Sequence, residues 1–190
     1  MKITTVIGSP KVQGHGAKIA AALLALLGEH GAHNTTYELN RLTYRGCQAC
    51  LACKTETDVC VERDDLSAIL SDIRQSDVVI VAAPVFMGEV SAQAKGLFDR
   101  FYSFLGPDFR TNPRPGRLAA GKTLVFILTQ GNPDKEMFGS VLSRQARVFH
   151  RCGFSAVLPI HACGVGSDSD ADLDAPTMAL IAETAKKLRA

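Results

Sequence analysis

Four of the six cysteines lie close together, at Cys47, Cys50, Cys53 and Cys60. Their spacing is C-x2-C-x2-C-x6-C, and three thiols at successive gaps of two can converge from one tight loop. Iron–sulfur clusters are held by four cysteine thiolates, and C-x2-C-x2-C is a compact arrangement of such ligands. Structural zinc sites more often use two separated C-x2-C pairs. The spacing fits a self-contained 4Fe–4S cluster, but it equally allows reduced or oxidised thiols in a subunit-contact loop, and spacing alone does not separate the two.

The second feature with chemical potential is the loop from Gly8 to Gly16, which follows a β-branched strand pattern and precedes an Ala/Leu-rich helix pattern. Backbone N–H groups at a helix N-terminus point outward, and the helix dipole favours an anion there. The glycine spacing matches neither the dinucleotide fingerprint nor the Walker loop. The loop is thus a candidate phosphate site of another kind, and the alternative is an ordinary strand–turn–helix connection.

Two other loops follow strand patterns and differ from plain connectors. The loop 84–91 offers apolar and aromatic side chains and a glycine, and the loop 129–134 offers amides from Gln130 and Asn132. Ligands of doubly wound sheets bind beyond the carboxyl ends of the strands, where the strand order reverses. Together with a phosphate on the first loop, these groups suit a planar, hydrogen-bonding, phosphorylated cofactor, and flavin mononucleotide (FMN) matches that description.

The elements that must position these loops alternate between strand and helix along the chain. Continuous apolar runs such as 78–81 and 124–128 are typical of strands buried on both faces of a parallel sheet. The pattern predicts an α/β fold with three layers: a flavodoxin-like, doubly wound, five-stranded parallel sheet of order 2-1-3-4-5. The predicted strands are 2–8, 34–39, 77–83 (ended by Pro84), 122–129 and 154–160, and the predicted helices are 16–27, 64–75, 91–104 (capped by Ser91), 134–151 and one from 174.

The composition is that of an ordinary globular chain, with 190 residues, 46% hydrophobic and 21% charged, and a net charge of +2. We expect one domain over 1–190, with a cysteine-rich loop at about 41–64. The small net charge argues against a nucleic-acid partner, and no apolar run is long enough to span a membrane. The strand-like start without a signal peptide leads us to expect a cytoplasmic, reducing setting.

Three segments carry a resemblance to a known family: GSPKVQGHGAKIA at 8–20, APVFMGEVSAQAKGLFDR at 83–100 and TQG at 129–131. Over about its first 150 residues the chain resembles the NAD(P)H-dependent FMN reductases of the flavodoxin-like superfamily. The resemblance implies a bound FMN that takes electrons from NAD(P)H and passes them to a quinone, flavin or nitro compound, or to a protein partner. It implies that FMN contacts Ser9, Lys11, Gln13, His15 and Gly16 at the phosphate, Pro84, Val85, Phe86, Met87 and Gly88 along the ring and ribityl chain, and Thr129, Gln130 and Gly131 on the other side.

The chain departs from this family at one pair of positions. Family members commonly carry Asn-Thr where this chain has His15-Gly16, and Gly16 cannot supply the threonine hydroxyl to a phosphate. Backbone N–H groups and a protonated His15 could compensate.

The cysteine segment also resembles the cluster loop of the iron–sulfur flavoproteins, which are relatives of the same reductases. Two alternatives to a reductase follow: an electron carrier that does not itself use NAD(P)H, and a flavin-binding sensor with a thiol switch. No catalytic side chain is expected, because the cofactor carries the chemistry. We also predict a homodimer or homotetramer, in which the long loop within 105–121 covers the ligand loops.

Overall fold

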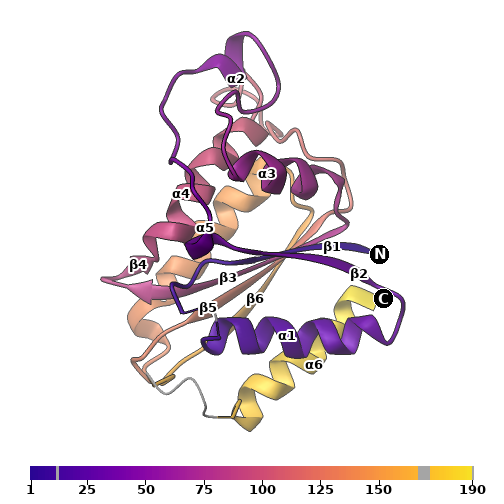
Figure 1. Cartoon of the computed structure of the whole chain (residues 1–190), viewed down its shortest axis with the longest axis vertical. Coiled ribbons are helices and arrows are strands. Elements are labelled where there is room, and N and C mark those ends of the chain that lie inside the picture. The colour runs from indigo at the N-terminus through magenta and orange to yellow at the C-terminus, as the bar shows by residue number, and fades with distance from the viewer. Residues whose placement is uncertain (12, 167–171, 190) are drawn as a thin grey trace.

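A central parallel sheet organises the chain (Figure 1). The structure, a computed structural model, describes residues 1–11, 13–166 and 172–189. The parallel strands lie in the order β2-β1-β3-β5-β6. Counted along the chain, these five strands have the order 2-1-3-4-5, which confirms the predicted flavodoxin-like topology. Their bounds are β1 (Lys2–Ile7), β2 (His33–Glu38), β3 (Val78–Phe86), β5 (Thr123–Thr129) and β6 (Ala156–Ala162).

Helices cover both faces of the sheet and complete three layers (Figure 1). One face packs against α1 (His15–Gly28) and α6 (Ala175–Arg189). The opposite face packs against α3 (Leu66–Gln75), α4 (Ala92–Arg100) and α5 (Glu136–Cys152). Alternate residues of the central strands enter the two cores, because successive side chains of a strand point to opposite faces. The helices thus cover both faces of the sheet, and the loops at the ends of its strands are left to form binding sites.

The third strand is longer than predicted. We expected Pro84 to end it, and this expectation is wrong, since β3 continues to Phe86 and turns back as β4 (Glu89–Val90). Pro84 is tolerated because β1 pairs with β3 only as far as Ala82 and β4 pairs with it only from Val85, so neither strand needs a hydrogen bond from the proline nitrogen. The two turn residues, Met87 and Gly88, have φ values of +50° and +82°, the signature of a tight two-residue hairpin.

The helix predicted over 91–104 is divided into α4 and a 3₁₀ turn, η2 (Phe101–Phe104). Ser91 caps α4 as predicted, because its Oγ accepts a hydrogen bond from the N–H of Ala94 at 3.4 Å. The same Oγ donates to the carbonyl of Gly8 at 2.5 Å. This buried serine therefore ties the start of α4 to the first loop of the candidate site.

The cysteine segment and the long loop after α4 interrupt the alternation of strands and helices along the chain. They lie together at one end of the molecule. The cysteine segment follows η1 (Leu39–Arg41) and contains the short helix α2 (Ala52–Thr55), which lies at one end of the long axis in Figure 1. Lys54 donates to the carbonyl of Leu105 at 2.6 Å, and Arg117 donates to the carbonyl of Cys53 at 2.8 Å. Within one chain the long loop therefore packs against the cysteine segment. None of the helices in the described ranges is long and apolar enough to span a membrane.

Candidate functional site

A cleft of about 280 Å³ opens at the carboxyl ends of β1, β3 and β5. The three loops that the sequence singled out meet there. Such a cleft lies where doubly wound sheets bind their ligands, and it is near the lower end of the usual size of small-molecule sites. The predicted residues that line it are Ser9, Lys11, His15, Gly16, Pro84, Val85, Phe86, Thr129, Gln130 and Gly131.

One end of the cleft is formed by the start of α1. The residue before the helix is Gly14, and no described side chain caps the helix there. Ala17 and Lys18 donate to the carbonyl of Gly14 at 2.9 and 3.1 Å, so the N–H groups of His15 and Gly16 are the first-turn donors that an anion could use. A Cβ on Gly16 would lie 3.2 Å from the Cβ of Ala82, so this glycine lets α1 approach β3 closely. The end of the cleft at α1 is therefore built from backbone donors rather than from a threonine hydroxyl.

The other side of the cleft is apolar and comes from the end of β3. Ala82, Ala83, Pro84, Val85 and Phe86 line it in sequence. Because Phe86 is 50% exposed, part of its ring surface remains available to a flat ligand. This wall suits a planar aromatic group.

Three predicted ligand-contacting residues do not line the cleft. Met87 and Gly88 form the tip of the β3–β4 hairpin, and Met87 is fully exposed. Gln13 is an exposed residue in the loop before α1. None of the three is among the residues that line the cleft.

The side chain of Gln130 forms hydrogen bonds to other residues of the protein. Its Nε2 donates to the carbonyls of Asn132 at 2.9 Å and Asp134 at 2.7 Å, which leaves Oε1 to accept. His161 on β6 lies with Nε2 at 2.8 Å from that oxygen, so Nε2 carries the proton. We expected the Gln130 amide to be offered to a ligand, whereas it instead holds the loop 130–134 in shape.

Other residues of the cleft were missed from the sequence. Pro10 and Gly14 lie inside a loop that was already predicted, and Ala82 and Ala83 lie at the end of a predicted strand. Val165 and Gly166 follow β6, and the rule that ligands bind beyond the carboxyl ends of strands could have found them.

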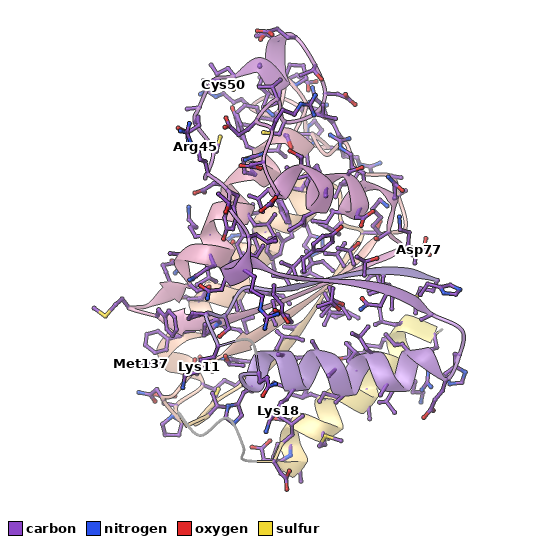
Figure 2. The ribbon with its side chains drawn as sticks, in the orientation of Figure 1. Lys11, Lys18, Arg45, Cys50, Asp77 and Met137 are labelled. Atoms are coloured by element: carbon purple, nitrogen blue, oxygen red, sulfur yellow. The ribbon has the colours of Figure 1, made fainter. Side chains whose placement is uncertain are left out.

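A second, smaller hollow of about 20 Å³ lies at the far end of the molecule and is lined by all four predicted cysteines. Figure 2 shows Cys50 at the opposite end of the molecule from Lys11 of the cleft. Cys47 and Cys50 are exposed, Cys53 is buried and Cys60 is half-buried. Among the described residues, no three Cys, His, Asp or Glu side chains are already placed to hold a metal ion. The four thiols share one hollow but are not drawn together at ligand spacing.

The backbone of this hollow is strained. Ala49 and Leu51 have φ values of +54° and +62°, a left-handed conformation that costs free energy in residues other than glycine. Such residues cluster at functional sites, and alternating backbone conformations turn successive N–H groups toward one point, as in many iron–sulfur sites. The two residues flank Cys50, so the strain lies among the four predicted cysteines.

Positive charge surrounds the cysteine segment. Lys54 and Arg74 donate to backbone carbonyls there, as does Arg117. Burial lowers the pKa of Lys54 below its ordinary value, and the charge of Arg117 acts in the same direction, while Cys53 opposes it.

Arg100, at the end of α4, lines the same hollow and is 1% exposed. Its Nη1 lies 2.9 Å from Oδ2 of Asp64. Burial alone would lower the pKa of Arg100, but Asp64 and the nearby Cys60 raise it. Burial alone would likewise raise the pKa of Asp64, but hydrogen bonds from Arg100 and the Arg45 N–H lower it. The pair is thus charged, and Arg100 is its member that lines the hollow.

Comparison with known proteins gives consistent matches. The sequence model of the family described as NADPH-dependent FMN reductase matches residues 1–146. An iron-sulfur flavoprotein of Methanosarcina thermophila is 42% identical over 100 residues, which are 53% of this chain and 52% of that protein. One from Methanocaldococcus jannaschii is 31% identical over 125 residues, 66% of this chain and 61% of that protein. The matched region thus spans about half to three fifths of these relatives.

Solved structures share the fold. An FMN-dependent NADH-azoreductase from Bacillus anthracis, in complex with FMN, superposes with a TM-score of 0.69 at 14% identity and covers 100% of both chains. A flavodoxin of Streptococcus pneumoniae superposes with a TM-score of 0.59 at 16% identity, covering 100% of this chain and 98% of that chain. At these identities the likeness concerns the fold alone.

Proposed function

Because the chain belongs to the NADPH-dependent FMN reductase family, we propose that it is an FMN-dependent oxidoreductase that takes electrons from NAD(P)H. The observation that carries the proposal is the cleft, in which ten of the residues expected to contact FMN line one hollow at the carboxyl ends of three strands. When bound, FMN accepts a hydride and passes electrons on, so the protein needs no acid–base residues of its own.

The residues present fit FMN in their chemistry. The uncapped start of α1 offers backbone N–H groups to the phosphate, and His15 beside them can add a donor. The apolar wall from Ala82 to Phe86 borders the ring, and its small residues allow close approach of backbone to a flat ligand. The loop 129–131 closes the other side, where Gln130 stiffens the backbone through its internal hydrogen bonds. The protein's task is to bind and orient the cofactor and to keep water from one face of the ring.

The cysteine segment favours a second component. We propose that Cys47, Cys50, Cys53 and Cys60 hold a 4Fe–4S cluster, supported by their common hollow, the strained backbone between them and the surrounding cations. The similarity to proteins named iron-sulfur flavoproteins supports the same proposal. The cysteines must move together to bind the cluster, because the hollow of about 20 Å³ is small. With a cluster, the protein would deliver electrons singly to a protein or small-molecule acceptor.

The assembly we propose is a homodimer or homotetramer. The apolar wall of the cleft and the exposed Phe86 and Met87 at its rim favour cover by a second copy. Size-exclusion chromatography with light scattering tests this, and a monomer that still shields FMN from solvent would contradict it.

The direct test of the cleft is a charge change at its phosphate end. His15→Glu places an acid in the first turn of α1, which favours the helix but repels a phosphate. We expect FMN affinity, measured by quenching of flavin fluorescence, to fall at least tenfold, about 1.4 kcal/mol, without loss of thermal stability. His33→Glu makes the same change at an exposed position on β2, outside the cleft, and should leave affinity unchanged. Wild-type protein that cannot bind added FMN would refute the proposal.

Electron donation is tested separately. Under anaerobic conditions NADH or NADPH should bleach the flavin absorption of the FMN-loaded protein. If dithionite bleaches it and neither nucleotide does, the protein is instead a carrier that does not itself use NAD(P)H.

A further inference from the structure

The buried guanidinium of Arg100 has one polar atom that the fold leaves unpaired. Its Nη1 donates to Oδ2 of Asp64 at 2.9 Å and to the carbonyl of Arg45 at 3.1 Å, and its Nη2 donates to the carbonyl of Glu62 at 3.2 Å. Its Nε is also buried, but it has no hydrogen-bond partner among the described residues. A buried donor without an acceptor is costly, so its presence points to an acceptor that comes within hydrogen-bond reach only when the surroundings of Arg100 rearrange.

The surroundings of Arg100 indicate what that acceptor is. Arg100 lines the hollow of the four cysteines, and its guanidinium is close enough to Cys60 for the two groups to interact. The acceptors that enter this hollow when the cysteines bind a cluster are sulfur atoms carrying negative charge.

We propose that Arg100 donates an Nε–H···S hydrogen bond to the sulfur of Cys60 when the four cysteines hold their cluster, and that it thereby raises the cluster's reduction potential. The inference rests on the proposed cluster. Arg100 acts here as a positioning residue, because it works through a ligand of the cluster and not on a substrate.

The other cations of the segment are arranged differently. The described hydrogen bonds of Lys54, Arg74 and Arg117 all go to backbone carbonyls. None of these three residues lines the hollow of the cysteines. Lys54 also interacts with the thiol of Cys53. No described hydrogen bond of Arg74 or Arg117 goes to a cysteine sulfur. Arg100 differs from all three because it lines the hollow with an unpaired buried donor. Arg117 therefore offers a matched control.

The expected direction follows from charge. Reduction by dithionite adds one electron to the cluster, and the reduced form is one unit more negative. Hydrogen bonds to the sulfurs and a buried positive charge stabilise this form and raise the potential. Arg100→Lys keeps the charge but removes the Nε–H, so the reduction equilibrium should shift roughly tenfold toward the oxidised form, or 59 mV for one electron.

The experiment compares wild-type protein, Arg100→Lys and Arg117→Lys after anaerobic reconstitution with iron and sulfide. Iron and acid-labile sulfide per chain report cluster content, and a redox titration followed by electron paramagnetic resonance (EPR) reports the midpoint potential. We expect full clusters in all three proteins and a more negative potential only in Arg100→Lys. Equal potentials in Arg100→Lys and wild type, or an equal shift in Arg117→Lys, would overturn the inference.

Two outcomes need a separate reading. If wild-type protein takes up no iron or sulfide, the cluster proposal itself fails, and this inference fails with it. If wild-type protein holds a cluster but Arg100→Lys does not fold or load, pulsed EPR on reduced, ¹⁵N-arginine-labelled protein decides. A ¹⁵N coupling that persists in Arg117→Lys supports the hydrogen bond, and absence of any coupling refutes it.

Discussion

Replacing His161 with phenylalanine tests the hydrogen bond by which His161 holds Gln130 at the edge of the cleft. His161 is 8% exposed, and its only described hydrogen bond is the one from Nε2 to Gln130. Its Nδ1 is buried and has no partner in the described part of the chain. Burial lowers the pKa of His161 below its usual value, Lys135 adds to this effect and Glu136 opposes it. We therefore expect a neutral imidazole in the folded protein.

The size of the expected stability change follows from the linkage between proton binding by His161 and folding. Well above pH 6.5 the histidine is neutral in both folded and unfolded chains, so it contributes no pH dependence there. Below that pH the unfolded chain binds a proton more readily than the folded chain, so stability falls as pH falls toward the lowered folded pKa. At pH 5.5 this loss reaches at most about 1.4 kcal/mol. The phenylalanine variant lacks this loss, but at pH 8 it is less stable by about 1–3 kcal/mol because Oε1 of Gln130 loses its donor.

Urea unfolding at pH 8 and pH 5.5 provides the assay. The stability gap between wild type and His161→Phe should narrow as the pH falls. His33→Phe, a change at an exposed histidine on β2, should leave the pH dependence as in wild type. A gap that is the same at both pH values, or that widens at pH 5.5, would show that His161 is not held neutral.

Three other outcomes follow from buried contacts. Gly8→Ala would place a Cβ 2.8 Å from a side chain of α4, so it should lower the free energy of unfolding by about 1–3 kcal/mol and also weaken FMN binding. In the control Gly28→Ala the new Cβ meets nothing within 4 Å, so this variant should not be destabilised. Asp64→Asn leaves the charge of Arg100 without its partner and should cost up to about 3–5 kcal/mol, measured by urea unfolding. Cys152, whose pKa burial raises to about 12, should resist a thiol reagent at pH 7 until the protein unfolds.

The fold could be predicted because its signals are local and repeated. Apolar runs alternate with helical stripes, and this pattern leaves few arrangements other than a doubly wound sheet. The error at Pro84 came from reading proline as a strand end without knowing where the neighbouring strand stops. That depends on the register of β1 against β3, which no local pattern records.

The site could be predicted only in part. The three loops were found because each follows a strand, and the sheet brings them together. The engagement of Gln130 by His161 could not be foreseen, since the two residues are 31 positions apart and meet only after β5 and β6 pair. The same holds for Arg100, because a charged residue on a helix is expected to face solvent until its buried partner is known.

The helix α4 connects the two candidate sites. Its first end is held by Ser91, which donates to Gly8 beside the cleft, and its last residue is Arg100, which lines the cysteine hollow. At 1.5 Å per residue, this helix is about 13 Å long. The segment 83–100, one of the three that carry the family resemblance, therefore contains most of the cleft wall, the cap and the buried arginine in one continuous stretch. A variant that displaces α4 as a whole, unlike a single side-chain change at its end, should therefore alter both FMN affinity and cluster content.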